Sequence, residues 1–275
     1  MKLRFGTAGL PIVTEPRNTE NGIATVRTLG LDALELEFVH SVNIRPEKAK
    51  ELKKIANQHD IVLTCHAPYY INLNAKEAEK RNASLQRLLN SCRILSLAGG
   101  WSCVVHAAYL LGEPEEKVTQ KLIPIFKKIV ATLRNEGHDV WVRPEFAGKL
   151  AQWASLEGLV TVSEAVDGML PCIDFAHAHA YTNGKYNHAA EIRELLTTLE
   201  KRLGRTCLNN MHIHIAGIAY GPKGERNHLN LADADLKYKE ILKVWKEFKL
   251  GGVVICESPN IEKDALKLQK QYQQQ

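Results

Sequence analysis

Residues 102–145 read SCVVHAAYLLGEPEEKVTQKLIPIFKKIVATLRNEGHDVWVRPE, and they contain one complete unit of the pattern that decides the fold. Both ends of this stretch are short apolar runs with several valines, SCVVHAA from Ser102 and DVWVRPE from Asp139, which are typical of buried strands. Between them, apolar residues recur at three- and four-residue steps and so share one face of a helix: Val118, Leu122, Ile125, Ile129 and Leu133. Gly137 follows this helix at the position of a C-terminal cap, so the unit is predicted to be strand, helix, strand.

The same alternation runs along the whole chain. The predicted strands are LRFGTA from Leu3, DALELEF from Asp32, IVLTCHA from Ile61, SCVVHAA from Ser102, DVWVRPE from Asp139, MLPCIDF from Met169, MHIHIAG from Met211 and GVVICES from Gly252. Strands that alternate with helices form a parallel sheet with right-handed crossovers. Because there are eight of them, and no glycine-rich GxGxxG turn follows the first, we predict an α/β fold of the (β/α)₈ TIM-barrel type rather than an open doubly wound sheet.

The length of the chain fits one such barrel. We therefore expect a single TIM-barrel domain over residues 1–275, with a polar C-terminal tail, QKQYQQQ from Gln269, that frays. One connection, Gly217 to Asp233, is longer than βα loops usually are. Connections of that length tend to be functional, so this one is a candidate for part of the site.

Composition bounds the class of protein. Neither the N-terminal MKLRFGTAGLPIV nor any later stretch is apolar for long enough to be a signal peptide or a membrane span, so we expect a cytoplasmic protein with no membrane partner. The six cysteines occur singly, without a CxxC pair, as in proteins whose thiols stay reduced. The net charge of +5 suits a polyanionic partner, although scattered surface lysines would give the same total.

Histidines and carboxylates fall where the predicted strands end. They are His66, His106, Glu145, Asp174 with His177, His212 and His214, and Glu257. All strands of a barrel finish at the same mouth, so these side chains converge there. Each one alone is explained by packing or by a salt bridge, but several buried carboxylates together are costly without a cation. The sequence therefore predicts a metal site.

The mixture of ligands narrows the choice of metal. Imidazole with carboxylate suits Zn, Mn, Fe or Co, whereas Mg and Ca sites are mainly oxygen. The set exceeds what one tetrahedral zinc ion can use, so two or three ions bridged by carboxylates fit better. Such a cluster can generate a hydroxide nucleophile and stabilise both oxygens of a phosphoryl displacement.

Six motifs along the chain resemble those of one known family. They are HAPYYINL from His66, VVHA around His106, PEFAGK around Glu145, PCIDFAHAHA around Asp174, MHIHIAG from Met211 and ICESP around Glu257. In this order they resemble the endonuclease IV family of apurinic/apyrimidinic endonucleases, and MHIHIAGIAYGPKGERNHL resembles its archaeal-type branch. The resemblance implies a TIM barrel of the xylose isomerase-like superfamily with three zinc ions. It also implies cleavage of double-stranded DNA on the 5′ side of abasic sites, as in base excision repair.

The resemblance also assigns roles to residues. His66 and His106 match zinc-binding histidines, Glu145 matches a carboxylate that bridges two ions, Asp174 and His177 match a ligand pair, and Glu257 matches the last carboxylate. Glu145 is accordingly the expected catalytic residue. Tyr69 matches an aromatic that wedges into DNA at the lesion, where a tyrosine ring can stack. Its alternative is a rim tyrosine without a role in binding DNA.

The chain departs from the family at three places. His212 and His214 point the same way in a strand; a gapless match favours His212 and the HIAG match favours His214, which we prefer because it is nearer the strand's end. The family's Asp-x-His pair in the long connection is replaced by Glu225 and His228, one residue further apart, which we still expect to be ligands. The family's HPG reads HAA from His106, and the second-strand loop VHSVNIR lacks a DNA-penetrating arginine.

Two enzymatic functions remain. The first is the zinc-dependent abasic-site endonuclease, expected to act as a monomer, with Lys149, Lys223 and Arg226 placed to contact phosphates. The alternative is a divalent-metal-dependent sugar isomerase or epimerase on the same barrel, which needs about four metal ligands and leaves His66 and His106 unexplained. A catalytically silent scaffold would be expected to have lost ligands.

Overall fold

Eight parallel strands set the fold, and all eight lie where the sequence predicts them. In the computed structural model, which describes residues 2–275, they are β1 (Leu3–Ala8), β2 (Ala33–Glu37), β3 (Val62–His66), β4 (Ser102–Val105), β6 (Trp141–Pro144), β8 (Cys172–Asp174), β9 (Met211–Ile215) and β12 (Gly252–Cys256). Every residue of β4, β9 and β12 is buried. This is the pattern of strands that are covered on both faces.

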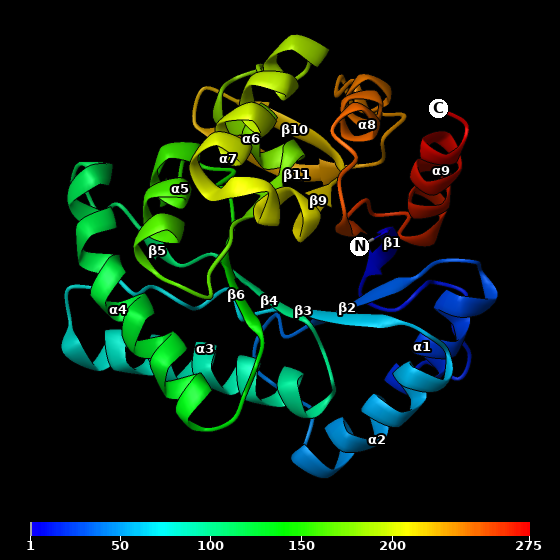
Figure 1. The fold of residues 1–275 in the computed structure, drawn as a ribbon, viewed down its shortest axis with the longest axis horizontal. Coiled ribbons are helices and arrows are strands. Elements are labelled where there is room, and N and C mark those ends of the chain that lie inside the picture. Colours follow the sequence, from blue (N-terminus) through cyan, green and yellow to red (C-terminus); the bar gives the residue numbers. More distant parts are fainter. Residues whose placement is uncertain (1) are drawn as a thin grey trace.

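The strands form one curved sheet that closes on itself. Their hydrogen-bonded order is β6-β4-β3-β2-β1-β12-β9-β8, and each neighbouring pair is parallel. The ring closes between β6 and β8 through bridges that join Val142 to Met169 and Glu145 to Cys172. The helices lie outside this ring (Figure 1). The predicted (β/α)₈ TIM barrel is confirmed.

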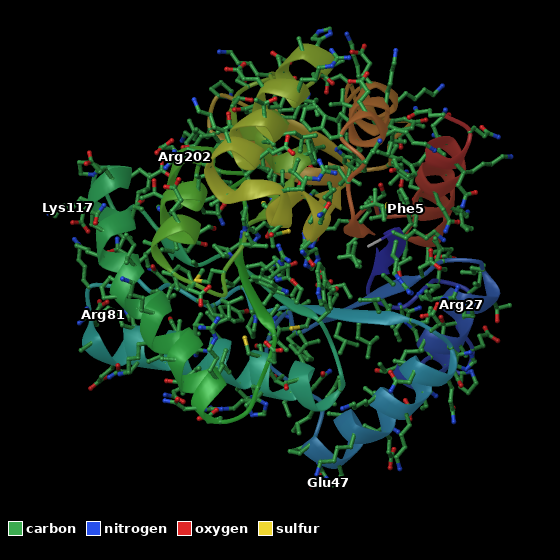
Figure 2. The ribbon with its side chains drawn as sticks, viewed as in Figure 1. Phe5, Arg27, Glu47, Arg81, Lys117 and Arg202 are labelled. Atoms are coloured by element: carbon green, nitrogen blue, oxygen red, sulfur yellow. The ribbon has the colours of Figure 1, made fainter. Side chains whose placement is uncertain are left out.

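The helices follow the strands in alternation. They are α1 (Thr19–Thr28), α2 (Pro46–Gln58), α3 (Ala78–Leu97), α4 (Glu115–Asn135), α5 (Leu156–Ala165), α6 (Phe175–Tyr181), α7 (Ala189–Asn209), α8 (Tyr238–Glu247) and α9 (Glu262–Gln273). In α4 four residues of the predicted apolar stripe, Val118, Leu122, Ile129 and Leu133, are buried, and Ile125 is partly buried. Charged residues labelled in Figure 2 lie on the outer helices, whereas Phe5 of β1 is buried.

Two short antiparallel pairs of strands extend the barrel at the ends of its strands. Strand β5 (Ala108–Tyr109) pairs with β7 (Gln152–Trp153), and β10 (Gly217–Gly221) pairs with β11 (Gly224–Leu229). The connection predicted as a long loop from Gly217 is therefore largely an antiparallel hairpin. It is placed beside α6, with which both of its strands make contact.

Helix α9 includes most of the polar C-terminal segment and extends to Gln273. The ring of Tyr272 packs 5.4 Å from that of Phe5, and the Tyr272 carbonyl accepts a hydrogen bond from Lys246. This aromatic contact joins α9 to β1.

The remaining expectations from composition concern cysteines and membranes. All six cysteines are buried and free. Within residues 2–275, no helix combines the length and the apolar character needed to span a membrane.

Candidate metal centre

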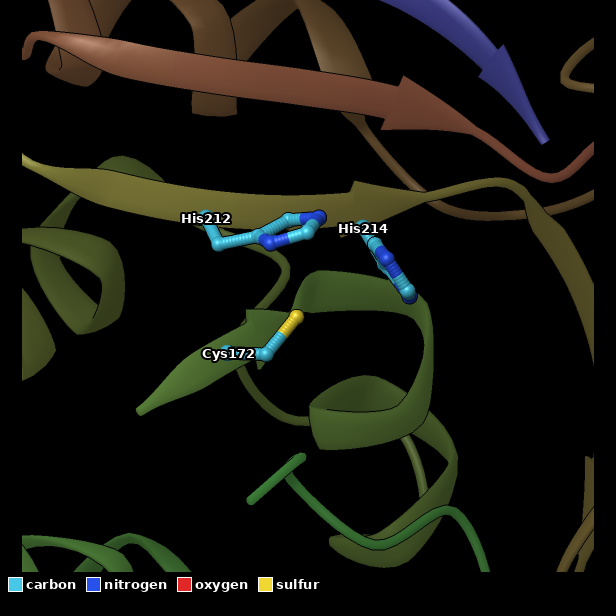
Figure 3. A group of neighbouring side chains, drawn as sticks. All are labelled: Cys172, His212 and His214. Carbon is cyan, nitrogen blue, oxygen red and sulfur yellow. The ribbon is translucent and has the colours of Figure 1, made fainter. Parts of the chain in front are cut away.

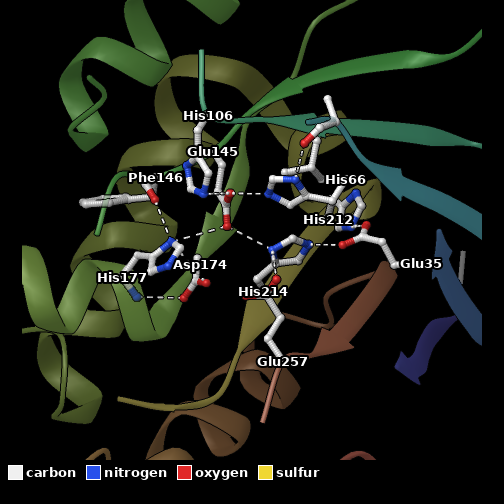
Figure 4. A network of polar contacts seen from close by, with 12 residues as sticks. Glu35, His66, His106, Glu145, Phe146, Asp174, His177, His212, His214 and Glu257 are labelled. Atoms are coloured by element: carbon white, nitrogen blue, oxygen red, sulfur yellow. Dashed lines mark hydrogen bonds and ion pairs between the residues drawn. The ribbon is translucent and has the colours of Figure 1, made fainter. Parts of the chain in front are cut away.

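The histidines and carboxylates singled out in the sequence gather at one mouth of the barrel (Figure 4). His66 is the last residue of β3, His106 follows β4, and Glu145 follows β6. Asp174 ends β8 and caps α6, where its carboxylate accepts the backbone N–H of His177. His214 lies in β9, and Glu257 follows β12. These side chains form three groups in which the potential ligand atoms lie within 4.8 Å of one another.

The first group contains His66, His106 and Glu145. One oxygen of Glu145, Oε2, lies 3.2 Å from Nε2 of His66 and 3.1 Å from Nε2 of His106. The His66 ring is fixed because its Nδ1 donates to the carbonyl of Ala67 at 2.8 Å. In the metal-free structure Nε2 forms a hydrogen bond to Glu145 Oε2 at 3.2 Å, and in a neutral ring it is the nitrogen that could bind a cation.

The second group uses the other oxygen of Glu145, together with Asp174, His214 and Glu257. Nδ1 of His214 lies 2.9 Å from Glu145 Oε1 and 3.3 Å from Glu257 Oε1. Glu145 thus faces two groups with its two oxygens, which is the arrangement of a bridging carboxylate.

The third group contains Asp174, His177 and His228. Nε2 of His177 and Nε2 of His228 face each other at 3.4 Å, and Glu225 Oε2 lies 3.7 Å from the same His177 atom. His177 Nδ1 donates to the carbonyl of Phe146 at 3.1 Å, which leaves Nε2 free to act as a ligand. Asp174 belongs to both the second and the third groups.

A β-bulge brings Glu225 and His228 to the same face of β11. Tyr220 pairs with Glu225 but Ala219 pairs with Asn227, so Arg226 is an extra residue on this strand. Without the bulge, residues three apart in a strand would point to opposite faces. The unusual spacing of this pair in the sequence is therefore compensated by local backbone geometry.

Gly148 allows the hairpin to approach the barrel. The backbone N–H of Glu225 donates to the Gly148 carbonyl at 2.8 Å. A Cβ atom at Gly148 would lie 2.6 Å from Glu225 Oε2 and 2.8 Å from a ring carbon of His177. Only glycine leaves room for both side chains at this point.

The electrostatics of the site reflect buried charges at close range. Burial lowers the pKa of His106 to about 3. For His66, burial opposes protonation, but the contact with Glu145 outweighs it and raises the pKa to about 9. Burial, with Glu145 and Asp174 close by, raises the pKa of Glu257 well above its usual value. A divalent cation would replace these shared protons with a fixed positive charge.

An independent observation also indicates that these residues could bind a cation. Asp174 Oδ2 and Glu257 Oε2 are buried side-chain oxygens that lack a hydrogen-bond partner. Unpaired buried carboxylate oxygens are costly, and coordination to an ion satisfies them. Mixed imidazole and carboxylate groups suit transition metals.

A fourth group, Cys172 with His212 and His214, lies deeper in the barrel (Figure 3). It fits an ion poorly. His212 uses Nδ1 on the hydroxyl of Ser102 at 2.9 Å and has Nε2 3.1 Å from Glu35. Burial raises the pKa of Cys172 to about 12, so its thiol keeps its proton. The geometry accordingly favours His214, rather than His212, as the histidine that could bind an ion at the mouth of the barrel.

Sequence reasoning missed two carboxylates on β2. Glu35 is fully buried beneath the site, and one oxygen of Glu37, Oε1, is buried without a partner. Burial and the nearby Glu35 raise the pKa of Glu37 to about 7. The signal was present in DALELEF, where two acidic residues at alternate positions share one face of an otherwise apolar strand.

The mouth opens into a cleft of about 320 Å³. Tyr69, which is 51% exposed, lies at its rim with its ring 5.4 Å from that of His66; Tyr109 and Lys149 also line the cleft. Lys223 and Arg226 are exposed on the hairpin. A larger hollow of about 490 Å³ lies beside the starts of β1 and β12, at the opposite end of the barrel, and its lining includes Lys2 and Lys246.

Several relatives are similar to this chain in sequence, and two of them illustrate the range. An uncharacterized protein of Methanocaldococcus jannaschii is 37% identical over 98% of this chain and 97% of its own length. A probable endonuclease 4 of Mycoplasma pneumoniae is 22% identical over 75% of this chain and 72% of its own length.

Solved structures agree on the fold. A D-tagatose 3-epimerase-like protein matches with a TM-score of 0.75 and 18% identity, covering 100% of this chain and 97% of its own. Endonuclease IV from Thermus thermophilus matches with a TM-score of 0.73 and 17% identity, covering 98% of both chains. The sequence profile of the xylose isomerase-like TIM barrel family matches residues 23–274, and the chain belongs to that family.

Proposed function

We propose that this protein is a zinc-dependent endonuclease that cleaves double-stranded DNA on the 5′ side of abasic sites. The observation that carries the proposal is the sharing of Glu145 and Asp174 among three groups of potential ligands. Ions held there would supply a nucleophile derived from water and stabilise the attacking and leaving oxygens of an in-line phosphoryl displacement.

The protein's own residues would hold this centre rigidly. Glu145 is 1% exposed, and its two oxygens face different histidines at 2.9–3.2 Å. The backbone carbonyls of Ala67 and Phe146 orient the rings of His66 and His177. Because the ligands sit at the ends of strands, small movements of the surface loops leave their spacing unchanged.

Support for a DNA substrate comes from the rim of the cleft. The exposed ring of Tyr69 offers a surface on which a base or an unpaired nucleotide can stack. Lys149 lines the same cleft, and the chain carries a net charge of +5. The relative in Mycoplasma pneumoniae is named as a probable endonuclease.

The number of potential ligands separates this function from the sugar isomerase or epimerase. An isomerase centre with about four ligands, such as Glu145, Asp174, His214 and Glu257, would leave His66 and His106 without a role as ligands. Shared fold with an epimerase-like protein does not favour that chemistry, because one barrel supports many reactions.

The decisive experiment combines metal analysis with a nicking assay. Zinc-loaded protein should contain two or three ions per chain and should nick a duplex with an abasic analogue, leaving a 3′ hydroxyl. Glu145→Gln should keep the fold and lose at least about 10³-fold in activity, because an amide cannot bridge two ions. Intact duplex with a fully loaded centre would refute the DNA substrate, and metal-dependent conversion of a ketose or aldose would then identify the isomerase.

Tyr69→Ala tests the contact with substrate separately. We expect weaker cleavage, by about 10-fold, since one stacking contact is worth about 1–3 kcal/mol. Zinc content should be unchanged, because Tyr69 lies at the rim and belongs to none of the three groups. Loss of zinc in this variant would instead indicate a structural role for the ring.

A further inference from the structure

Glu35 is a buried carboxylate that the proposed reaction does not use. It lies in β2 with no exposed surface, directly beneath the mouth of the barrel (Figure 4). Burying an ionised carboxylate is costly unless several donors surround it. The surroundings of Glu35 therefore indicate what it does.

Three side chains surround the Glu35 carboxylate. The hydroxyl of Thr64 donates to Oε2 at 2.8 Å, and Nε2 of His212 lies 3.1 Å from the same oxygen. Nε2 of His214 lies 2.9 Å from Oε1. Burial alone would raise the pKa of Glu35, but His214 and His212 outweigh it and hold the pKa below its usual value.

His214 connects Glu35 to the candidate metal centre. Its Nε2 lies 2.9 Å from Glu35 Oε1 as an ion pair without hydrogen-bond geometry. Its Nδ1 forms a hydrogen bond to Glu145 Oε1 at 2.9 Å and lies 3.3 Å from Glu257 Oε1, so a bound ion would take the place of the proton on Nδ1. A neutral imidazole carries its proton on one nitrogen and a lone pair on the other. If the proton points to Glu35, the lone pair points to the centre.

His212 forms a further layer behind this contact. Its ring nitrogens face Glu35 and the hydroxyl of Ser102, so neither of them reaches the mouth. The two histidines of β9 thus flank one carboxylate, and only His214 extends beyond it. This arrangement accounts for the second histidine of the HIH motif without making it a ligand.

We propose that Glu35 is a positioning residue that fixes the tautomer and orientation of His214, so that Nδ1 serves the metal centre. The buried negative charge of Glu35 also makes the lone pair of His214 a stronger ligand for a cation. The inference rests on the metal centre of the proposed function but not on its DNA substrate.

Cobalt(II) provides a readout that is independent of catalysis. Protein stripped of metal should be titrated with cobalt, following the visible d–d spectrum and measuring affinity by competition with a chelator. Glu35→Gln should weaken the binding of the ion at the second group by about 10–100-fold and alter its spectrum. Glu35→Asp, which keeps the charge, should recover part of the affinity.

Two variants serve as matched controls in the same buried region. Thr64→Val removes the hydrogen bond from the Thr64 hydroxyl to Glu35 Oε2, and Ser102→Ala removes the hydrogen bond between Ser102 and Nδ1 of His212. Neither residue contacts His214 through a polar bond, so both variants should keep wild-type cobalt spectra even if stability falls. Circular dichroism monitors the fold of all four variants.

A measurement on the unaltered protein covers the case in which Glu35→Gln fails to fold. Nitrogen-15 NMR of histidine side chains in zinc-loaded protein should show His214 protonated at Nε2 only. A proton at Nδ1, or a folded Glu35→Gln with the cobalt affinity and spectrum of the wild type, would overturn the inference. Wild-type protein that binds cobalt but leaves abasic duplex intact would refute only the proposed substrate.

Discussion

At the scale of single residues, Glu37 is a buried carboxyl group with one oxygen that lacks a hydrogen-bond partner. It lies two positions after Glu35 on the same face of β2, and its Oε1 is buried without a hydrogen-bond partner. Burial, with Glu35 next in effect, raises its pKa from 4.5 to about 7. The folded, metal-free protein therefore holds this proton at pH values where an unfolded chain has released it.

Glu37→Gln should make the metal-free protein more stable at pH 8, by about 2 kcal/mol, and should have little effect below pH 4.5. The wild type loses stability as the pH rises from 4.5 to about 7, because only the unfolded state ionises freely over that range. Glutamine resembles the protonated carboxyl group and does not ionise, so the variant should not lose stability over this pH range. Urea unfolding in a chelator at both pH values measures the difference, with the exposed Glu194→Gln as control. A gain of equal size at both pH values would contradict the explanation.

At the scale of elements, the hairpin β10–β11 completes the third group of potential ligands. It is held by the hydrogen bond from Glu225 to Gly148 and by a bridge between Lys149 and Gly224. On the other side, the Tyr220 hydroxyl donates to Asp235, which also lies 3.1 Å from His179 of α6. The hairpin is thus clamped from two sides.

Gly148→Ala should displace Glu225 and His177, because the added methyl group would overlap both. We expect about one ion fewer per chain than in the wild type and activity reduced by roughly 10–100-fold, with circular dichroism unchanged. Leu150→Ala, an exposed neighbour, should keep the full metal content. Full occupancy in Gly148→Ala would show that the third group does not hold an ion.

Some elements of this fold can be predicted from the sequence and others cannot. The barrel strands are recognisable because they are continuous apolar runs, and their ends mark the mouth. The β10–β11 hairpin is not recognisable in the sequence. Its two strands, GIAYG and GERNHL, are rich in glycine and polar residues, which usually indicate a loop. The bulge at Arg226 depends on pairing between strands, and the choice of His214 over His212 depends on depth in the barrel. The bulge cannot be predicted from spacing, whereas the position of His214 nearer the end of its strand indicates the choice that the geometry favours without showing the contacts of His212.

At the scale of the whole molecule, the candidate metal centre spans the place where the barrel closes. Glu145 follows β6 and Asp174 ends β8, and these are the two strands joined by isolated bridges rather than by a full ladder. In the next two strands of the ring, His214 lies in β9 and Glu257 directly follows β12. Ions bound there would tie the closing strands together.

Removing metal should therefore lower the stability of the entire barrel. An ion present at 100 times its dissociation constant stabilises a folded state by about 2.7 kcal/mol. We expect a fall in Tm of roughly 5–10 °C with a chelator, recovered when zinc is added. Differential scanning calorimetry measures it, and Glu257→Gln should show a smaller fall. Equal Tm values with and without the chelator would show that metal binding does not stabilise the closed barrel.

The spread of the ligands along the chain has a consequence for biogenesis. His66, His106 and Glu145 emerge from the ribosome long before Glu257, which lies close to the C-terminus. At about 5–20 residues per second, translation from Glu145 to Glu257 takes roughly 5–25 s. During that interval a nascent chain presents imidazoles and carboxylates without the strands that close around them. Ions that need Glu257 as a ligand could therefore bind with their full set of ligands only after β12 has been synthesised.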